Sequence, residues 1–227
     1  SLHEKNTSLD EIIRERTDEL KKEITVRQQA EEHIRHQALH DSLTGLPNRS
    51  LLKDRLQQDI YNARRYNKFI SVLLIDIDRF SEINNTLGHR NGDVLLMEIA
   101  NRLQSTLRLG DTIARYERRA GPETVARIGG DAFTIILPML PSVDTATEIV
   151  SRIREVFSRP FNLDGVLLEV NARISIVNYP EHGEDADLLL QHSDVAMYHA
   201  KQTHQDCVVY SHEFDNFSTF RLTLMSE

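Results

Sequence analysis

Apolar positions recur along the chain at two different spacings, which predict helices and strands in turn. From Ser50 to Tyr66 they recur at helical spacing, as in a helix with one buried face. Phe69–Ile75 is an apolar run with β-branched residues, which is typical of a buried strand. The same criteria predict helices over residues 79–87, 92–107, 141–159 and 184–201, and strands over residues 112–115, 125–128, 132–137, 167–177 and 207–210.

The order of these elements sets the expected fold class. Helices and strands are interleaved, and Gly129, Gly130 and Asp131 place a tight hairpin turn between two of the strands. This order predicts an α+β fold, an α/β sandwich in which helices cover a mixed sheet.

Residues 1–38 contain neither glycine nor proline and are rich in good helix formers, so they predict one long helix. Its apolar residues fit a heptad seam that polar residues interrupt. An interrupted seam is typical of a marginal or switchable coiled coil, which would join two copies of the chain through residues 1–38. The alternative is a solvated helix that leans on its own domain. The seam has Leu2, Leu9 and Ala30 at position d and Ile13, Leu20 and Ile34 at position a, with Arg16, Glu23 and Arg27 as its interruptions.

Composition narrows the class of protein. The chain has 227 residues, of which 27% are charged and 40% are hydrophobic, as in an ordinary soluble protein. Its apolar runs are far shorter than the roughly 18 residues that a membrane span needs, so we expect a cytoplasmic location, with any membrane anchor upstream in a longer protein. The single cysteine, Cys207, excludes an internal disulfide and a cysteine-based zinc site. A net charge of −8 argues against nucleic acid as the main partner.

Candidate metal ligands stand at the end of the buried strand. Asp76 and Asp78 follow the apolar run directly, and Asp131 would join them if its strand pairs with the first. Carboxylates are hard ligands suited to Mg²⁺, which is typically held by one or two of them plus substrate phosphates. The alternative is that these acids are surface caps and that the turn at residues 129–131 is a plain hairpin.

Several ordered motifs, taken together, resemble the GGDEF domain family, the diguanylate cyclases that join two GTP molecules into cyclic di-GMP. They are DSLTGLPNR at 41–49, DIDRF at 76–80, IN at 83–84, GH with GD at 88–93, ARIGGDAF at 126–133 and AMYHAK at 196–201. The resemblance implies a GGDEF-type domain over residues 41–211, with a palm-like, ferredoxin-like sheet and the signature turn on a central hairpin. Residues 1–40 would then be a signalling helix.

The resemblance also implies roles for single residues at the metal site. Asp76 and Asp131 match the metal-binding carboxylates, with the Ile77 carbonyl as a further ligand for Mg²⁺ or Mn²⁺. Asp131 also matches the catalytic acceptor of the proton from the attacking ribose 3′-hydroxyl.

Other residues match the family's substrate contacts. Asn84 and Asp93 match the readers of the guanine base of GTP, and an amide with a carboxylate suits that base edge. His89 matches a further substrate contact, and Lys201 a phosphate contact. The turn at residues 77–81 would offer backbone N–H groups to the phosphates.

Four positions depart from the family pattern. Ala132 replaces the second acid of the signature, Ser81 a phosphate-contacting lysine, Gln205 an arginine and Asn85 an aspartate. Because phosphoryl transfer depends on charge stabilisation, these changes predict a GTP-binding domain with weak or lost cyclase activity that regulates a neighbouring domain. An active diguanylate cyclase is the alternative, and a pure dimerisation module is the second alternative.

A near repeat precedes the signature. DTIAR at 111–115 returns as ETVAR at 123–127, twelve residues later. The family's inhibitory RxxD motif would fall on Ala120 and Glu123, whereas Arg108 and Asp111 have the right residue types one repeat earlier. We interpret Glu117–Ile128 as an insertion that moves the inhibitory arginine away from the turn. The alternative is a longer hairpin loop with a chance likeness.

Two further expectations concern the C-terminal part of the chain. His192, His199 and His204 are expected to be exposed surface residues rather than metal ligands. Residues 212–227 resemble the start of a linker helix toward a downstream EAL phosphodiesterase domain in a larger signalling protein.

Overall fold

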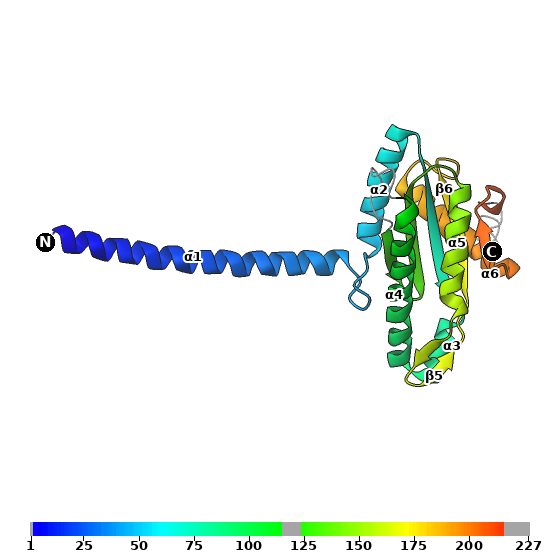
Figure 1. Ribbon diagram of the computed structural model, residues 1–227, viewed down its shortest axis with the longest axis horizontal. Helices are drawn as coiled ribbons and strands as arrows, with labels where there is room; N and C mark the ends of the chain where they lie inside the picture. The colour runs from blue at the N-terminus through cyan, green and yellow to red at the C-terminus, as the bar shows by residue number, and fades with distance from the viewer. Residues whose placement is uncertain (1, 115–123, 216–227) are drawn as a thin grey trace, which may run out of the picture. The chain divides into compact units, whose positions relative to one another are not determined.

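The computed structural model describes residues 2–114 and 124–215, which form two units, Ser1–His40 and Asp41–Glu227 (Figure 1). The first unit is α1 (Leu2–Leu39), the long helix predicted from composition. Four large apolar residues in the described part of α1 are more than half exposed, namely Leu20, Ile24, Val26 and Ile34. Pairing of two copies through this helix stays a prediction.

The second unit is built on a five-stranded sheet with the order β2-β3-β1-β6-β7. All neighbouring strands are antiparallel except β6 and β7, which are parallel. The strands are β1 (Phe69–Ile77), β2 (Thr124–Gly129), β3 (Ala132–Leu140), β6 (Ala172–Tyr179) and β7 (Cys207–Val209), while β4 (Phe161–Leu163) and β5 (Val166–Leu168) form a separate hairpin. This confirms the predicted mixed sheet.

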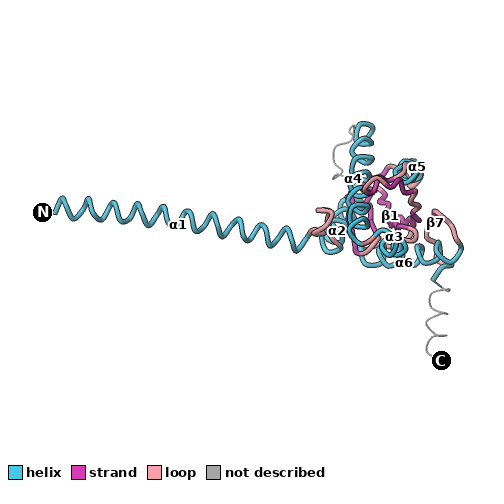
Figure 2. Tube along the Cα trace, turned by 90° about the horizontal axis from the view of Figure 1, so that it is seen from below, coloured by secondary structure: helices cyan, strands magenta, loops and turns pink. Residues whose placement is uncertain are grey.

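Helices cover both faces of the sheet, as Figure 2 shows from below. Side chains alternate along a strand, so Leu73, Ile75 and Ile77 of β1 join one core with α4 and α5, whereas Ile70 and Val72 join the other with α2 and α6. The helices of this unit are α2 (Arg49–Tyr66), α3 (Phe80–Leu87), α4 (His89–Ala114), α5 (Asp144–Ser158) and α6 (Ala186–Thr203). None of the helices in the described part of the chain is long and apolar enough to cross a membrane.

Side-chain caps fix where two of these helices begin. Asn48 Oδ1 accepts hydrogen bonds from the backbone N–H groups of Ser50 and Leu51, at 3.0 and 3.2 Å. Asp185 Oδ1 accepts one from the N–H of Leu188 at 2.8 Å. Such caps satisfy donors that the first helical turn leaves without intrahelical partners.

Two strand predictions were wrong. Thr112–Ala114 continue α4 instead of forming a strand, and Arg115 lies outside the described residues. The predicted strand at 167–177 is broken into β5 and β6, and β4 was missed. Asp164 and Gly165 both have positive φ, 51° and 90°, as a two-residue hairpin turn requires, so this Asp-Gly pair was the signal for the β4–β5 hairpin.

The hairpin that carries the signature turn joins β2 to β3. The expectation was a central hairpin. β3 does lie next to the central strand β1, but β2 is at the edge of the sheet. Most of the predicted insertion at 117–128 and all of residues 216–227 lie outside the described residues. Ala120 and Glu123 also lie outside them, and for Arg108 and Asp111 the structure describes only the backbone.

Candidate functional site

The candidate metal site is centred on Asp76, near the end of β1. Asp76 pairs in register with Ala132 on β3 and with Arg173 on β6. Its side chain lies on the same face of the sheet as α6, because Lys201 Nζ donates to Asp76 Oδ2 at 2.7 Å. Two predicted site residues, 125 positions apart, are therefore in direct contact.

Burial raises the pKa of Asp76 above its usual value, and the nearby carboxylates of Asp131 and Asp78 raise it further. Lys201 acts in the opposite direction through its hydrogen bond and its charge. A cation at this position therefore stabilises the ionised carboxylate, and the structure uses a lysine ammonium for that purpose.

The signature turn is attached to the end of β1. The backbone N–H of Ile77 donates to the carbonyl of Asp131 at 3.3 Å, and Ala132 stands directly across from Asp76. Directly paired residues have Cβ atoms roughly 5 Å apart, so an acid at 132 would be a second carboxylate beside Asp76. Alanine supplies no such group.

The donors present fit one hard cation completed by a substrate. Asp76, Asp131 and the Ile77 carbonyl supply oxygens alone, which is the chemistry of a Mg²⁺ site. The described residues contain no group of three or more His, Cys, Asp or Glu side chains that could hold a metal ion by themselves.

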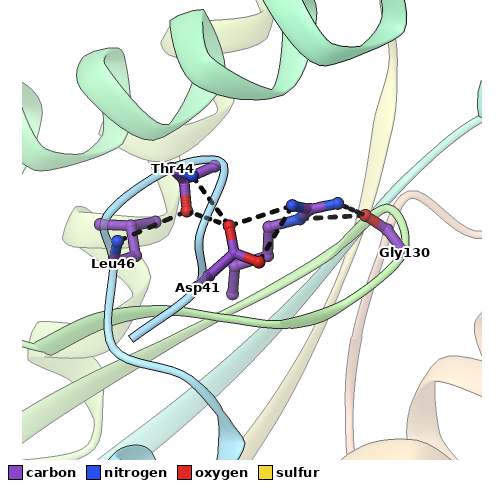
Figure 3. Close-up of polar contacts among 5 residues, drawn as sticks. Asp41, Thr44, Leu46 and Gly130 are labelled. Carbon is purple, nitrogen blue, oxygen red and sulfur yellow. Dashed lines mark hydrogen bonds and ion pairs between the residues drawn. The ribbon is translucent and has the colours of Figure 1, made fainter. Parts of the chain in front are cut away.

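Arg127 of β2 braces the signature turn, and Figure 3 shows the contacts around it. Its guanidinium donates to both oxygens of Asp41 at 3.0 and 3.1 Å and to the carbonyl of Gly130 at 3.1 and 2.7 Å. Asp41 also accepts from the N–H and the hydroxyl of Thr44, at 2.9 and 2.7 Å. Burial acts to raise the pKa of Asp41, but the bonds from Thr44 and Arg127 outweigh it and the pKa is lowered.

The candidate guanine readers lie on the α3–α4 hairpin. Gly88, with φ of 83°, is the one residue between the two helices, and its N–H donates to the carbonyl of Asn84 at 2.9 Å. Asn84 is partly buried, whereas His89 and Asp93 are exposed at the start of α4. The three residues are thus on one helical hairpin, on different elements from the acids of the metal site.

Comparison with known proteins agrees with this geometry. The profile of the family "Diguanylate cyclase, GGDEF domain" matches residues 38–120 and 118–207. The chain belongs to the GGDEF family. The two matched segments meet at residues 118–120, inside the predicted insertion.

Two proteins of Pseudomonas aeruginosa are among its curated GGDEF relatives. Diguanylate cyclase TpbB is 40% identical over 170 residues, which are 74% of this chain and 36% of TpbB. The bifunctional diguanylate cyclase/cyclic di-GMP phosphodiesterase MucR is 38% identical over 164 residues, which are 72% of this chain and 22% of MucR. The chain thus spans about a third or less of the length of these relatives.

Solved GGDEF structures confirm the fold. The GGDEF domain of TpbB aligns with a TM-score of 0.70 and 35% identity, over 79% of this chain and 99% of that one. The coiled coil and GGDEF domain of DgcB from Caulobacter crescentus, in complex with c-di-GMP, aligns with a TM-score of 0.72 and 24% identity, over 86% of this chain and 97% of that one. At that identity the second alignment shows the fold alone.

A cavity of about 600 Å³ lies on the side of α3 away from Asn84. Its lining includes Glu82, Ile83, Thr86 and Leu87 of α3, together with Asp78, Arg79, Val166, Leu168, Glu169, Val170, Asn171 and Arg173. Asp78 is held by an ion pair with Arg173. Asp78, a candidate metal ligand when only the sequence is considered, is therefore already paired with Arg173, the residue directly across from Asp76 on β6.

One ion pair near the signature turn was not predicted from the sequence, and the prediction that His192 is exposed was wrong. The ion pair between Asp41 and Arg127 joins two quoted motifs, so the motifs themselves were the available signal. His192 is buried, with Nδ1 2.6 Å from the carbonyl of His182 and its ring stacked on Tyr210 at 4.2 Å. The helical pattern of α6 could have shown this, because His192 lies on the same face as the buried Leu189 and Ala196. His204 is exposed as predicted, and His199 is partly buried.

Proposed function

We propose that the chain is the GTP-binding GGDEF domain of a cyclic di-GMP signalling protein, with weak or lost cyclase activity and a regulatory role on a neighbouring domain. The observation that carries this proposal is an asymmetry between two parts of the site. The base-reading hairpin keeps Asn84, His89 and Asp93, whereas the metal site has Ala132 directly across from Asp76. Binding and catalysis depend on different elements, so one can outlast the other.

In the proposed complex, Asp76, Asp131 and the Ile77 carbonyl would hold Mg²⁺ (or Mn²⁺). The ion, when bound, would neutralise charge that develops on the transferred phosphoryl group. Asp131 would accept the proton of the attacking ribose 3′-hydroxyl. Lys201, which pairs with Asp76 in this structure, is the residue that would contact the phosphates.

Three replaced residues weaken catalysis in the same direction. Ala132 removes a carboxylate from the metal site, and Ser81 and Gln205, both exposed, stand where the family has cations. Removal of one preorganised electrostatic donor commonly costs about 10²- to 10³-fold in rate. The three losses need not add, but each leaves transition-state charge less stabilised.

The decisive experiment is incubation of the chain with GTP and Mg²⁺, followed by nucleotide chromatography. We expect cyclic di-GMP near background, a rise for Ala132→Glu and a further rise for Ala132→Glu with Ser81→Lys. Asp131→Asn added to the improved variant should abolish the gain. Steady turnover by the unaltered chain, at a rate that Ala132→Glu leaves unchanged, would contradict the proposal that cyclase activity is weak or lost.

An active cyclase is the second candidate, and the contact between Asp76 and Lys201 favours it. These two residues are already assembled at 2.7 Å, beside a turn that carries Asp131. The same chromatography separates the two candidates. A pure dimerisation module is the third, and it predicts that no nucleotide binds.

Binding can be tested apart from turnover. Calorimetry should show tighter binding of GTP than of ATP, and Asn84→Ala or Asp93→Ala should reduce that preference. Equal affinity for the two nucleotides, or none for either, would contradict GTP recognition.

Assembly is a separate part of the proposal. Two GTP-loaded domains must meet to form cyclic di-GMP, and a coiled coil of residues 1–38 would bring two copies together. Deletion of residues 1–38 should lower the dimer fraction in light scattering. A monomer with and without this segment would exclude it as the dimerising element.

The downstream partner and product feedback complete the proposal. MucR, described as a bifunctional cyclase and phosphodiesterase, supports an EAL domain after residue 211 in the whole protein.

Cyclic di-GMP should not bind tightly at Ala120 and Glu123, and the displaced Arg108 and Asp111 are the alternative site. Tight product binding that survives Arg108→Ala would contradict this part.

A further inference from the structure

The α3–α4 hairpin brings Gly92 against the side chain of Asn84. The turn between the helices is short, and Gly92 N–H donates to the carbonyl of Gly88 at 3.3 Å. Asn91 Nδ2 donates to the carbonyl of Leu87 at 2.8 Å, which ties the first turn of α4 to the last turn of α3. Gly92 is buried within this junction.

The contact between Gly92 and Asn84 leaves no room for any side chain at position 92. A Cβ atom there would lie 1.9 Å from Oδ1 and 3.0 Å from Cγ of Asn84, and 3.3 Å from Cζ of Phe80. Gly92 lies inside α4, where glycine is less favourable than alanine. Its backbone does not need the positive φ that Gly88 has, so helix formation does not explain the glycine.

No hydrogen bond fixes the inner end of the Asn84 side chain. Asn84 Oδ1 is buried and has no hydrogen-bond partner in the described part of the chain. Buried polar atoms without partners are rare and often mark functional positions. We therefore attribute the orientation of this amide to the close approach of the Gly92 backbone.

We propose that Gly92 is a positioning residue for base recognition, because its missing side chain seats the Asn84 amide in the orientation that reads guanine. The inference rests on the proposed GTP-binding function and adds to it the residue that controls base selectivity. With Oδ1 at the buried inner end of the amide, the Nδ2 donors are the polar group left for the base edge, so a displaced amide no longer places those donors correctly.

The test is Gly92→Ala in the full chain. Asn84 Oδ1 is the end of a flexible side chain, so it should move aside while the helix gains a better helix former. The thermal midpoint should be unchanged or higher, whereas the GTP-over-ATP affinity ratio should fall by about 10- to 100-fold, which is the order of discrimination that one good hydrogen-bonded contact to a base edge supplies. Asn101→Ala, at an exposed position of the same helix, is the matched control and should leave the ratio unchanged.

A double-mutant cycle separates seating from general packing. In the Asn84→Ala background, Gly92→Ala should cause no further loss of selectivity, because the group that it displaces is absent. A further loss of equal size, or a lower midpoint with equal weakening of GTP and ATP, would make Gly92 a packing residue and overturn the inference.

A measurement without nucleotide keeps the two proposals distinguishable. The side-chain NH₂ resonances of Asn84 should shift in the ¹H–¹⁵N spectrum of Gly92→Ala and stay in place in that of Asn101→Ala. Unchanged Asn84 resonances would overturn the seating role even if GTP binds. A wild-type chain that binds GTP and ATP equally would overturn the proposed function, and with it the role of Gly92 in selectivity, while shifted resonances would still establish the seat.

Discussion

Replacement of Arg127 by alanine tests how the signature turn is held. The guanidinium makes four hydrogen bonds, two to the Asp41 carboxylate and two to the Gly130 carbonyl. The side chains of Arg127 and Asp41 are only 12% and 22% exposed, so the pair is neither a surface ion pair nor a fully buried one. Its removal leaves Asp41 with its two bonds from Thr44.

The expected loss of stability lies between two known limits. Truncation of one partner of a buried pair costs about 3–5 kcal/mol, and an exposed pair contributes about 0–1 kcal/mol. Because Thr44 still donates two hydrogen bonds to Asp41, we expect Arg127→Ala to lower the free energy of unfolding by about 2 kcal/mol, in line with hydrogen bonds to charged groups. For a domain of this size that is a fall of roughly 4–8 °C in the melting temperature.

Urea unfolding of the full chain measures this loss, and a double-mutant cycle with Asp41→Asn isolates the pair. The coupling energy should be about 1–2 kcal/mol, with an unchanged slope of free energy against urea. Lys53→Ala, which breaks the exposed 2.7 Å pair with Asp187, should cost less than about 1 kcal/mol. Coupling within the roughly 0.3–0.5 kcal/mol scatter of independent sites would refute the bracing role.

The pH dependence gives a second check on the same pair. The pKa of Asp41 is lowered in the folded state, so its contribution to stability is present above the ordinary value of 3.8 and is lost as the pH falls through the lowered pKa. The difference between wild type and Arg127→Ala should therefore shrink in acid. A difference that stays constant from neutral pH to below 3 would show that the charge of Asp41 plays no part.

Three further predictions follow from titratable and capping residues. Burial lowers the pKa of His182 below 6.5, and its Nδ1 accepts from the N–H of Asn178 at 3.0 Å. Stability should therefore fall as the pH drops below about 6.5. In His182→Gln, the free energy of unfolding measured with urea should change less between pH 5 and 7 than in the wild type. Burial raises the pKa of Asp76 although Lys201 opposes this, so Lys201→Met should raise it further and lower the melting temperature more at pH 7 than at pH 4; an Asp76 titration by NMR that does not move would contradict this. Asp185→Ala removes the cap of α6 and should cost about 1 kcal/mol, and calorimetric melting without any decrease would show that the cap is dispensable.

Spacing along the chain predicted most elements because each one buries a periodic face. It placed the end of β1 at Ile75, two residues early, because Asp76 ends the apolar run although the backbone ladder continues through Ile77. The same spacing predicted a strand at 112–115, within one of the two similar segments 111–115 and 123–127. Only the second copy pairs with β3, while Thr112–Ala114 continue α4. Similar residues therefore took different structures because their pairing partners differ.

The contacts within the candidate site could not be predicted from residue spacing as well as the fold could. Lys201 and Asp76 are 125 residues apart, and Arg127 and Asp41 are 86 apart, so no local pattern could pair them. The family motifs supplied Lys201 as a phosphate contact but not its ion pair with Asp76. The contact forms because α6 packs on the face of the sheet to which Asp76 points, and only the tertiary structure shows this packing.

The position of Ala132 offers a physical reason why, in the proposed function, GTP binding would persist without catalysis. Directly opposed like charges destabilise a pair of strands, and Asp76 already has a raised pKa from burial and from two neighbouring carboxylates. An acid at 132 would add a further negative charge across from it, which only a cation in the site could offset. Alanine removes that repulsion, so Lys201 alone can balance Asp76. Asn84 is on a different element, the α3–α4 hairpin, and in our proposal its orientation depends on Gly92. In the proposed function, loss of the acid therefore weakens the candidate metal site and leaves the α3–α4 hairpin unchanged.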